Sequence, residues 1–203
     1  EVDASASWST ERCRDCGAWA ATLKAAKRLE PGDELTVPRS LVAARDTILW
    51  PLEASFDGSV VTSEGVKHGG AGAILWAKDR QGALVCVGRA FLAIPYEADA
   101  LATEVRGLCL CSRLLTATIH QADSWRHGGS RRCRIVGDQV QVIRHCAGQA
   151  RLRGVTHMAL LDNSVGTMAG DAWRIDWQAV RRTQNLEAHG IARTAAKWAA
   201  AIC

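Results

Sequence analysis

The sequence predicts an α/β fold, and three observations support this. Residues 52–57 alternate between apolar and polar side chains, the period of a strand with one buried face. Two more strand-like segments follow after short polar connections, which is typical of an antiparallel meander. Long helical segments then alternate with two further strands. The expected element order is therefore β-β-β-α-β-α-α-β-α.

Composition indicates a globular protein of 203 residues with a real core, since 48% of residues are hydrophobic and 23% charged. No apolar run approaches the roughly 20 residues that cross a bilayer, so we expect no membrane partner. The net charge is +4, and arginines crowd residues 126–153 and 174–193. This distribution is compatible with nucleic acid, and it is equally what a solvated basic surface would show.

The cysteine pattern favours free thiols in an intracellular reducing compartment. Five of the eight cysteines lie in apolar segments, where Cys behaves as a small hydrophobic residue. These are Cys86, Cys109, Cys111, Cys133 and Cys146. Because the chain begins with Glu1 and not Met, we expect a processed product or a piece of a longer polypeptide, and the compartment itself stays unassigned.

Residues 1–51 differ from the rest and are expected to form an N-terminal helical extension before a domain at 52–203. A helix is predicted over 18–29, and a second from an N-cap at Ser40 through Trp50, where Pro51 stops it. Cys13 and Cys16 form a Cys-x-x-Cys pair. A zinc site would need a second pair, which does not follow at finger spacing, so loose thiols remain the alternative.

The domain begins with three predicted strands and a long helix. The strands cover 52–57, 70–77 and 83–91, and the helix covers 97–119. Glu104 lies on the apolar stripe of that helix, three residues after Leu101 and four before Leu108. A core-facing Glu is costly unless a group pairs with it; the alternative is a side chain that reaches solvent at the edge of the stripe.

The second half of the domain begins with a polar, basic loop at 120–132. The elements expected after it are a strand at 133–136, a helix at 139–147, a helical piece at 155–161, a Gly-rich loop at 163–171, a strand at 173–180 and a helix at 186–201. Asp138 is placed to cap the helix that follows it, which does not exclude a metal-binding role.

Four side chains could meet in one site. Asp57 ends the first strand, Glu104 faces inward from the long helix and Asp138 follows the fourth strand; His189 in the last helix is a further candidate. Three close carboxylates cannot all stay ionised without a cation. Oxygen ligands suit Mg²⁺ or Mn²⁺, and two such ions about 3.5–4 Å apart can clamp a phosphodiester. The simpler alternatives are a turn-capping Asp57 and a His189 on a helix face with no ligand role.

Five short segments give the sequence a resemblance to the ribonuclease H family. They are Phe56–Ser59, Gly70–Ile74, Ala102–Leu108, Arg134–Gln139 and Arg182–Ala192. They occur in the family's order, on the expected elements, and the likeness covers about residues 52–201. The resemblance is in particular to the ribonuclease H domains of retroelements and their plant relatives.

The resemblance implies a ribonuclease H-like fold, with a five-stranded mixed sheet flanked by helices, and metal-dependent hydrolysis of the RNA strand in RNA–DNA hybrids. It implies that Asp57, Glu104 and Asp138 take three metal-ligand places. The fourth place is usually Asp and is His189 here. Because imidazole is a poorer ligand than carboxylate for Mg²⁺, we expect His189 to tune the site toward Mn²⁺.

Nucleic-acid binding is assigned to five residues in these segments and in the arginine-rich loop 126–134. They are Gly58, Ser59, Arg131, Arg132 and Asn185. We expect the loop arginines to contact phosphates without reading sequence, so that binding weakens steeply with salt.

Two functions stay open at this point. One is an active endoribonuclease, for example the ribonuclease H domain of a retroelement reverse transcriptase. The other is a domesticated domain that binds RNA or protein inside a larger polypeptide or ribonucleoprotein assembly without cutting. His189, the N-terminal helices and the long basic loop favour the second, and fold alone does not decide activity.

Overall fold

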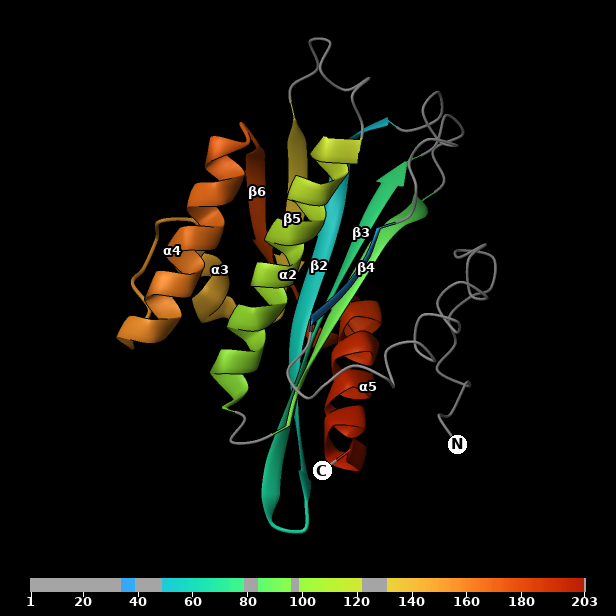
Figure 1. Ribbon diagram of the computed structural model, residues 1–203. Coiled ribbons are helices and arrows are strands. Elements are labelled where there is room, and N and C mark those ends of the chain that lie inside the picture. Colours follow the sequence, from blue (N-terminus) through green and yellow to red (C-terminus); the bar gives the residue numbers. More distant parts are fainter. Residues whose placement is uncertain (1–33, 39–48, 79–83, 96–98, 122–130, 203) are drawn as a thin grey trace.

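A computed structural model describes residues 34–38, 49–78, 84–95, 99–121 and 131–202 (Figure 1). In these ranges the chain forms one mixed sheet with helices on both faces. The strands are β1 (Glu34–Pro38), β2 (Leu49–Ser63), β3 (Val66–Lys78), β4 (Leu84–Ile94), β5 (Arg132–Gly137) and β6 (Arg174–Ala179). The helices are α2 (Ala100–Gln121), α3 (Val140–Cys146), α4 (Val155–Gly170), the short 3-10 helix η3 (Arg182–Gln184) and α5 (Leu186–Ile202).

The strand order in the sheet is β1-β4-β3-β2-β5-β6. Neighbouring strands from β1 through β2 are antiparallel, whereas β5 and β6 run parallel to β2. All five predicted strands are present as β2–β6, so the predicted five-stranded mixed sheet is confirmed. The sheet also has a sixth strand, β1, at its edge. It comes from the segment assigned to the N-terminal extension.

The β2–β3 hairpin is longer than predicted. Its strands continue to a two-residue turn at Glu64 and Gly65, whose φ angles are 50° and 81°. Positive φ at both turn residues matches the right-handed twist of a hairpin. The hairpin therefore projects past the helices (Figure 1), because β-branched residues carry the strand on beyond Asp57 and Gly58.

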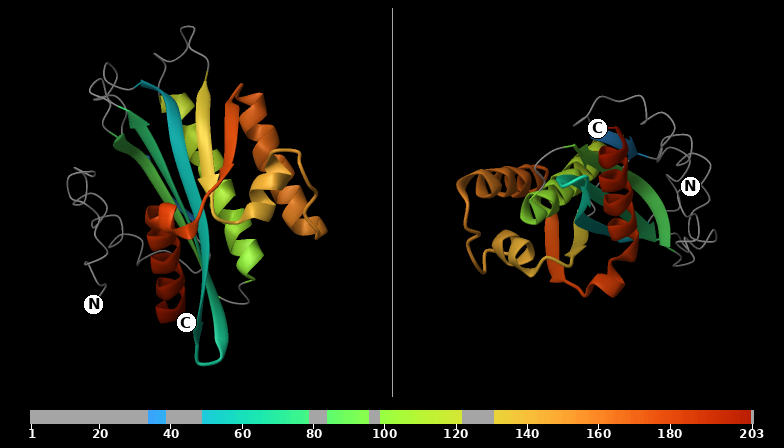
Figure 2. Two further views of the ribbon diagram at one scale, coloured as in Figure 1. Left: turned by 180° about the vertical axis from the view of Figure 1, so that it is seen from behind. Right: turned by 90° about the horizontal axis from the view of Figure 1, so that it is seen from below.

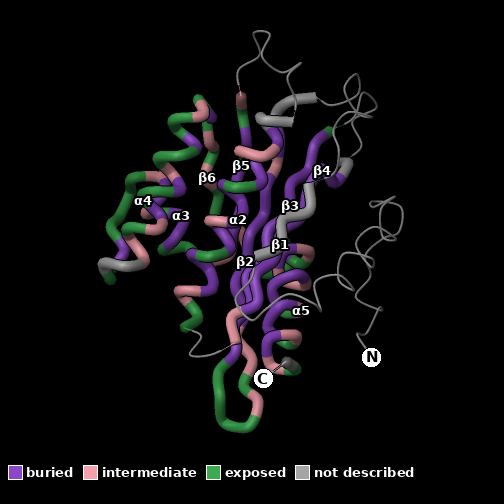
Figure 3. The backbone as a smooth tube through the Cα atoms, in the orientation of Figure 1, coloured by how far each residue is buried: buried purple, intermediate pink, exposed green. Residues whose placement is uncertain are grey.

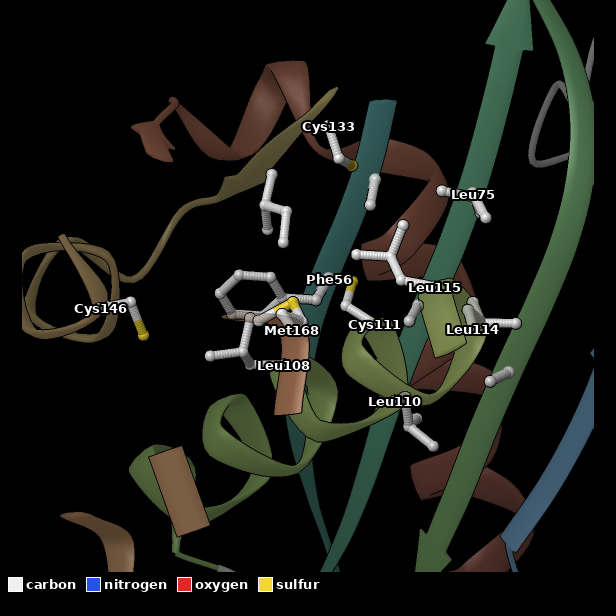
Figure 4. Packing of buried hydrophobic residues seen from close by; sticks show 14 of the residues in the cluster. Phe56, Leu75, Leu108, Leu110, Cys111, Leu114, Leu115, Cys133, Cys146 and Met168 are labelled. Atoms are coloured by element: carbon white, nitrogen blue, oxygen red, sulfur yellow. The ribbon is translucent and has the colours of Figure 1, made fainter. Parts of the chain in front are cut away.

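Helices α2 and α4 cover one face of the sheet and α5 covers part of the other (Figures 1 and 2). Phe56 points into the larger core, where Leu108, Cys111 and Met168 surround it (Figure 4). A smaller cluster joins β3 and β4 to α5 around Ile74, with the rings of Phe91 and Trp198 edge to face at 5.7 Å. The central strands are buried along most of their length (Figure 3).

Two predictions about the second half of the chain are wrong. Residues 163–170 are not a loop, because α4 continues to Gly170 with Leu161, Ser164 and Met168 buried at helical spacing. Asp138 is not the N-cap of α3: Gln139 occupies that position and accepts a hydrogen bond from the Gln141 amide. The Asp138 side chain therefore does not cap α3 and can take part in a site at the end of β5.

In the N-terminal segment, Leu49 and Trp50 begin β2, so the predicted second helix does not extend to Trp50. The rest of that helix, the predicted helix at 18–29 and the Cys13–Cys16 pair lie outside the described residues. Among the described helices none is long and apolar enough to cross a membrane.

Candidate metal site

Three carboxyl groups from three elements meet at one point of the sheet. Asp57 comes from β2, Glu104 from α2 and Asp138 from the turn after β5. One oxygen of each lies within 4.8 Å of one oxygen of each of the others. The predicted convergence of these acids is therefore present in the structure. Asp57 is fully buried, while Asp138 lies at the surface edge of the group.

Glycines let α2 and α5 approach the sheet closely on either side of Asp57. A Cβ at Gly107 of α2 would lie 2.7 Å from the Asp57 carbonyl oxygen, and a Cβ at Gly72 of β3 would lie 2.7 Å from the Ala192 amide of α5. Both distances are shorter than real Cβ contacts, so only glycine permits this packing. Asp57 is consequently held between α2 and α5.

The electrostatics of the group are unfavourable for three negative charges. Burial, with the nearby Asp57 carboxylate second, raises the pKa of Glu104 to about 9. Burial and Asp57 also raise the pKa of Asp138 above its ordinary value. One Glu104 oxygen, Oε2, is buried and makes no hydrogen bond within the described part of the chain.

These features fit a divalent cation. A positive ion among the three carboxyl groups would favour their ionised forms and give Glu104 Oε2 a partner, which offsets the cost of burying it. The donors are all hard oxygens, the kind that Mg²⁺ and Mn²⁺ prefer. Asp57, Glu104 and Asp138 are therefore the residues that would hold such an ion.

His189 adjoins this group without completing it. Its Nδ1 lies 2.7 Å from Asp57 Oδ2 and 3.0 Å from an Arg182 guanidinium nitrogen. An ionised carboxylate only accepts, so the contact with Asp57 requires a proton on Nδ1. In that state only Nε2 offers a lone pair. The ligand role expected for His189 therefore requires either Nε2 or the loss of the Asp57 contact.

Arg182 is a site residue that the sequence did not single out. Besides contacting His189, its Nε lies 3.9 Å from Asp138 Oδ2, and this guanidinium partly offsets the raised pKa of Asp138. It lies in a segment quoted for the family resemblance, seven residues before His189. That spacing spans η3 and the first turn of α5, so no single periodicity could reveal it.

Three residues assigned to nucleic-acid binding are buried next to the acids. Asn185 donates from Nδ2 to the Phe56 carbonyl at 2.8 Å, which ties the start of α5 to β2 beside Asp57. The Gly58 amide donates to Asp57 Oδ1, and Ser59 is 9% exposed. The hydrogen bonds of Asn185 and Gly58 orient the chain around Asp57, and contact of the three residues with nucleic acid stays a prediction.

Arg131 and Arg132, both predicted to bind nucleic acid, have different surroundings in the structure. Arg131 donates a hydrogen bond to the Asp171 carbonyl and so anchors the C-terminal end of α4. Arg132 is the first residue of β5 and is exposed. The loop at 122–130 lies outside the described residues.

Comparison of structures identifies the fold. The N-terminal RNase H domain of Rv2228c from Mycobacterium tuberculosis superposes with a TM-score of 0.55 at 19% identity, over 75% of this chain and 99% of that one. LC11-RNase H1, solved with an RNA/DNA hybrid, gives 0.55 at 14% identity, over 72% and 97%. LC9-RNase H1, described as a type 1 RNase H with the type 2 active-site motif, gives 0.51 at 21%, over 72% of each chain.

These likenesses show that the chain has the ribonuclease H fold, as the sequence resemblance implies. No family model matches the sequence, and no curated protein matches it.

Proposed function

We propose that this protein is a metal-dependent endoribonuclease that hydrolyses the RNA strand of RNA–DNA hybrids. The observation that carries the proposal is the meeting of Asp57, Glu104 and Asp138 within 4.8 Å on a ribonuclease H fold. Similarity to a structure solved with an RNA/DNA hybrid supports the substrate class. The resemblance to retroelement domains supports a reverse transcriptase, or another larger assembly, as the parent polypeptide.

Each side chain has a defined task in this proposal. Asp57, Glu104 and Asp138 hold Mg²⁺ or Mn²⁺, and His189 and Arg182 orient Asp57 and Asp138. A bound divalent cation supplies positive charge and Lewis acidity at a scissile phosphate. The enclosed position of Asp57 keeps water from screening that charge.

The decisive test is cleavage of a labelled RNA strand in a hybrid, with Mg²⁺, with Mn²⁺ and with a chelator. The parent is expected to cut with an ion and not with chelator. Asp57→Asn is expected to lose cleavage while keeping its fold by circular dichroism, since it removes a charge but little volume. Glu64→Gln is the matched control, because it removes a carboxylate at the exposed hairpin turn. Cleavage by Asp57→Asn at the parent's rate would exclude Asp57 as a ligand.

A second candidate function is a domesticated domain that binds RNA or a protein without cutting. His189 favours it, because its Nδ1 contacts Asp57 at the place where the family usually has a further carboxylate. A parent protein that binds the hybrid but does not cleave it with either ion would support this candidate over the nuclease.

A further inference from the structure

On the face of the sheet that carries α5, no helix of the described residues covers β5 and β6. Trp76 belongs to the cluster under α5 and is the register partner of Glu53, so Glu53 lies on this face. Arg134 pairs in register with Glu53 and with Asp176 of β6, which places both on the same face. No described helix covers this end of the sheet, as the view from behind shows (Figure 2).

Positive charge is in excess on this open face. Four cations and two acids line a cavity of about 560 Å³ at the N-terminal ends of the parallel strands. They are Lys78, Arg132, Arg134 and Arg174, with Glu53 and Asp176. This leaves a formal surplus of two positive charges around one hollow.

Arg134 interacts with both acids of the cavity, Glu53 and Asp176. Its guanidinium forms a two-nitrogen contact with Glu53 Oε2, and Asp176 adds a further attraction. The side chains of Lys78, Arg132 and Arg174 make no hydrogen bond or ion pair with any residue that the structure describes, and all three residues are exposed. We call these three the open-face cations.

Two of the open-face cations are direct neighbours. Arg132 and Arg174 are register partners on adjacent parallel strands. Like charges placed side by side in a sheet repel each other, and the repulsion is relieved when an anion lies between them. A guanidinium pair is well suited to phosphate, because each planar fork can donate two hydrogen bonds.

We propose that the open-face cations form a second phosphate-binding surface for a nucleic-acid strand, separate from the acidic group. Asp138 follows Arg132 by six positions of extended chain, a span of roughly 20 Å. One strand advances about 3.4 Å per nucleotide, so the surface meets the backbone some six nucleotides from the cut. The proposal deepens the proposed function, because it assigns how a longer substrate is held.

Salt dependence of binding tests the proposal. Hybrids of about 20 base pairs are titrated in chelator, which prevents metal-dependent cleavage, over a range of salt concentrations. Arg132→Gln with Arg174→Gln is expected to lower the log–log salt slope by about 1.5, since each phosphate contact contributes roughly 0.7–0.9. Arg193→Gln with Lys197→Gln removes the same charge from the exposed side of α5 and is expected to leave the slope unchanged.

Two further measurements sharpen the test. With hybrids of about six base pairs, also titrated in chelator, the Arg132 and Arg174 variant is expected to bind like the parent. A backbone of that length, bound at the acidic group, does not reach the open-face cations. Glu53→Gln is expected to tighten binding of the long hybrid, because it releases Arg134 to join the open-face cations.

The outcomes separate this inference from the proposed function. Equal salt slopes for the two double variants would overturn the second surface even if the parent cleaves hybrids normally. A lower slope for the Arg132 and Arg174 variant alone would support it even if no cleavage is detected with either ion. An effect of equal size on short and long hybrids would also overturn it, because it would place these arginines at the acidic group.

Discussion

His189 is the residue at which this chain departs most clearly from the family that it resembles. Its Nδ1 lies within hydrogen-bond distance of Asp57 Oδ2, and the Arg182 guanidinium on η3 lies beside it. Because Nδ1–H donates to Asp57, the same nitrogen does not also accept from Arg182. A group of this kind fixes the orientation of a ligand and tunes its basicity, and its loss typically costs about 10–100-fold in metal affinity or activity.

Substitution of His189 is expected to change both the rate and the preferred ion. His189→Ala should lower cleavage by about 10–100-fold with Mg²⁺ and with Mn²⁺, because Asp57 loses its hydrogen-bond donor. His189→Asp should raise the ratio of Mg²⁺-supported to Mn²⁺-supported cleavage, because it adds a hard oxygen ligand. Initial rates over a series of ion concentrations measure both effects. Parent-like cleavage by His189→Ala would remove His189 from the site.

The candidate site is partly predictable at the level of single residues. Asp57, Glu104 and Asp138 stand out because carboxylates on buried strand and helix positions are unfavourable without a partner. The roles of Arg182 and Asn185 are not predictable from local pattern. Asn185, for instance, holds a carbonyl 129 residues away, and only the tertiary fold brings the two groups together.

At the scale of elements, the spacing of apolar residues and the turn-forming residues predict most of the sheet. These signals fail where tertiary packing overrides them. The alternation at Trp173–Val180 predicts β6 correctly, because Ile175 and Trp177 on one face are half-buried against the core while the other face is exposed. Gly166 and Gly170 suggest a loop, yet α4 runs through Gly166 because Leu161 and Met168 anchor it to the core. Strand β1 is not predicted, although Glu34–Val37 alternate polar and apolar, because the segment is short, ends in Pro38 and takes its pairing from β4.

Docking of α5 is expected to depend on Gly72. Gly72→Ala places a Cβ 2.7 Å from the Ala192 amide and should destabilise the fold by about 1–3 kcal/mol, because neither backbone can yield easily. Gly166→Ala is the matched control. It lies on the exposed side of α4 with nothing within 4 Å of the new Cβ, and should stabilise by about 0.5–1 kcal/mol. Urea unfolding measures both, and equal stability of the two variants would contradict the close approach of α5.

For the molecule as a whole, the raised pKa of Glu104 links stability to pH and to metal. Between about pH 4.5 and pH 9 the folded protein binds this proton more tightly than the unfolded chain does. The contribution of Glu104 to the free energy of unfolding therefore falls as pH rises through this window. A cation among the carboxyl groups stabilises the ionised form and reverses the loss.

Thermal unfolding in chelator is expected to show this linkage. Glu104→Gln should be more stable than the parent at pH 8 and lose that advantage near pH 4.5, where Glu104 is protonated in both states. A difference of about 1 kcal/mol corresponds to roughly 2–4 °C in Tm for a chain of this size. Mg²⁺ at pH 8 should raise the Tm of the parent more than that of the variant. A difference in Tm between the parent and Glu104→Gln that stays constant across pH would contradict the raised pKa of Glu104.

Helix α5 also determines when the site is complete. Asp57 is buried partly because α5 lies against β3 and β2, and α5 begins 129 residues after Asp57. Chains emerge during synthesis from the N-terminus, at about 5–20 residues per second. Until residues 186–202 have emerged and docked, Asp57 lacks the cover of α5 and the contact with His189. If the proposed function holds, a partly synthesised chain does not yet have a complete metal site. Cleavage would then begin only after the last helix has been translated and has docked.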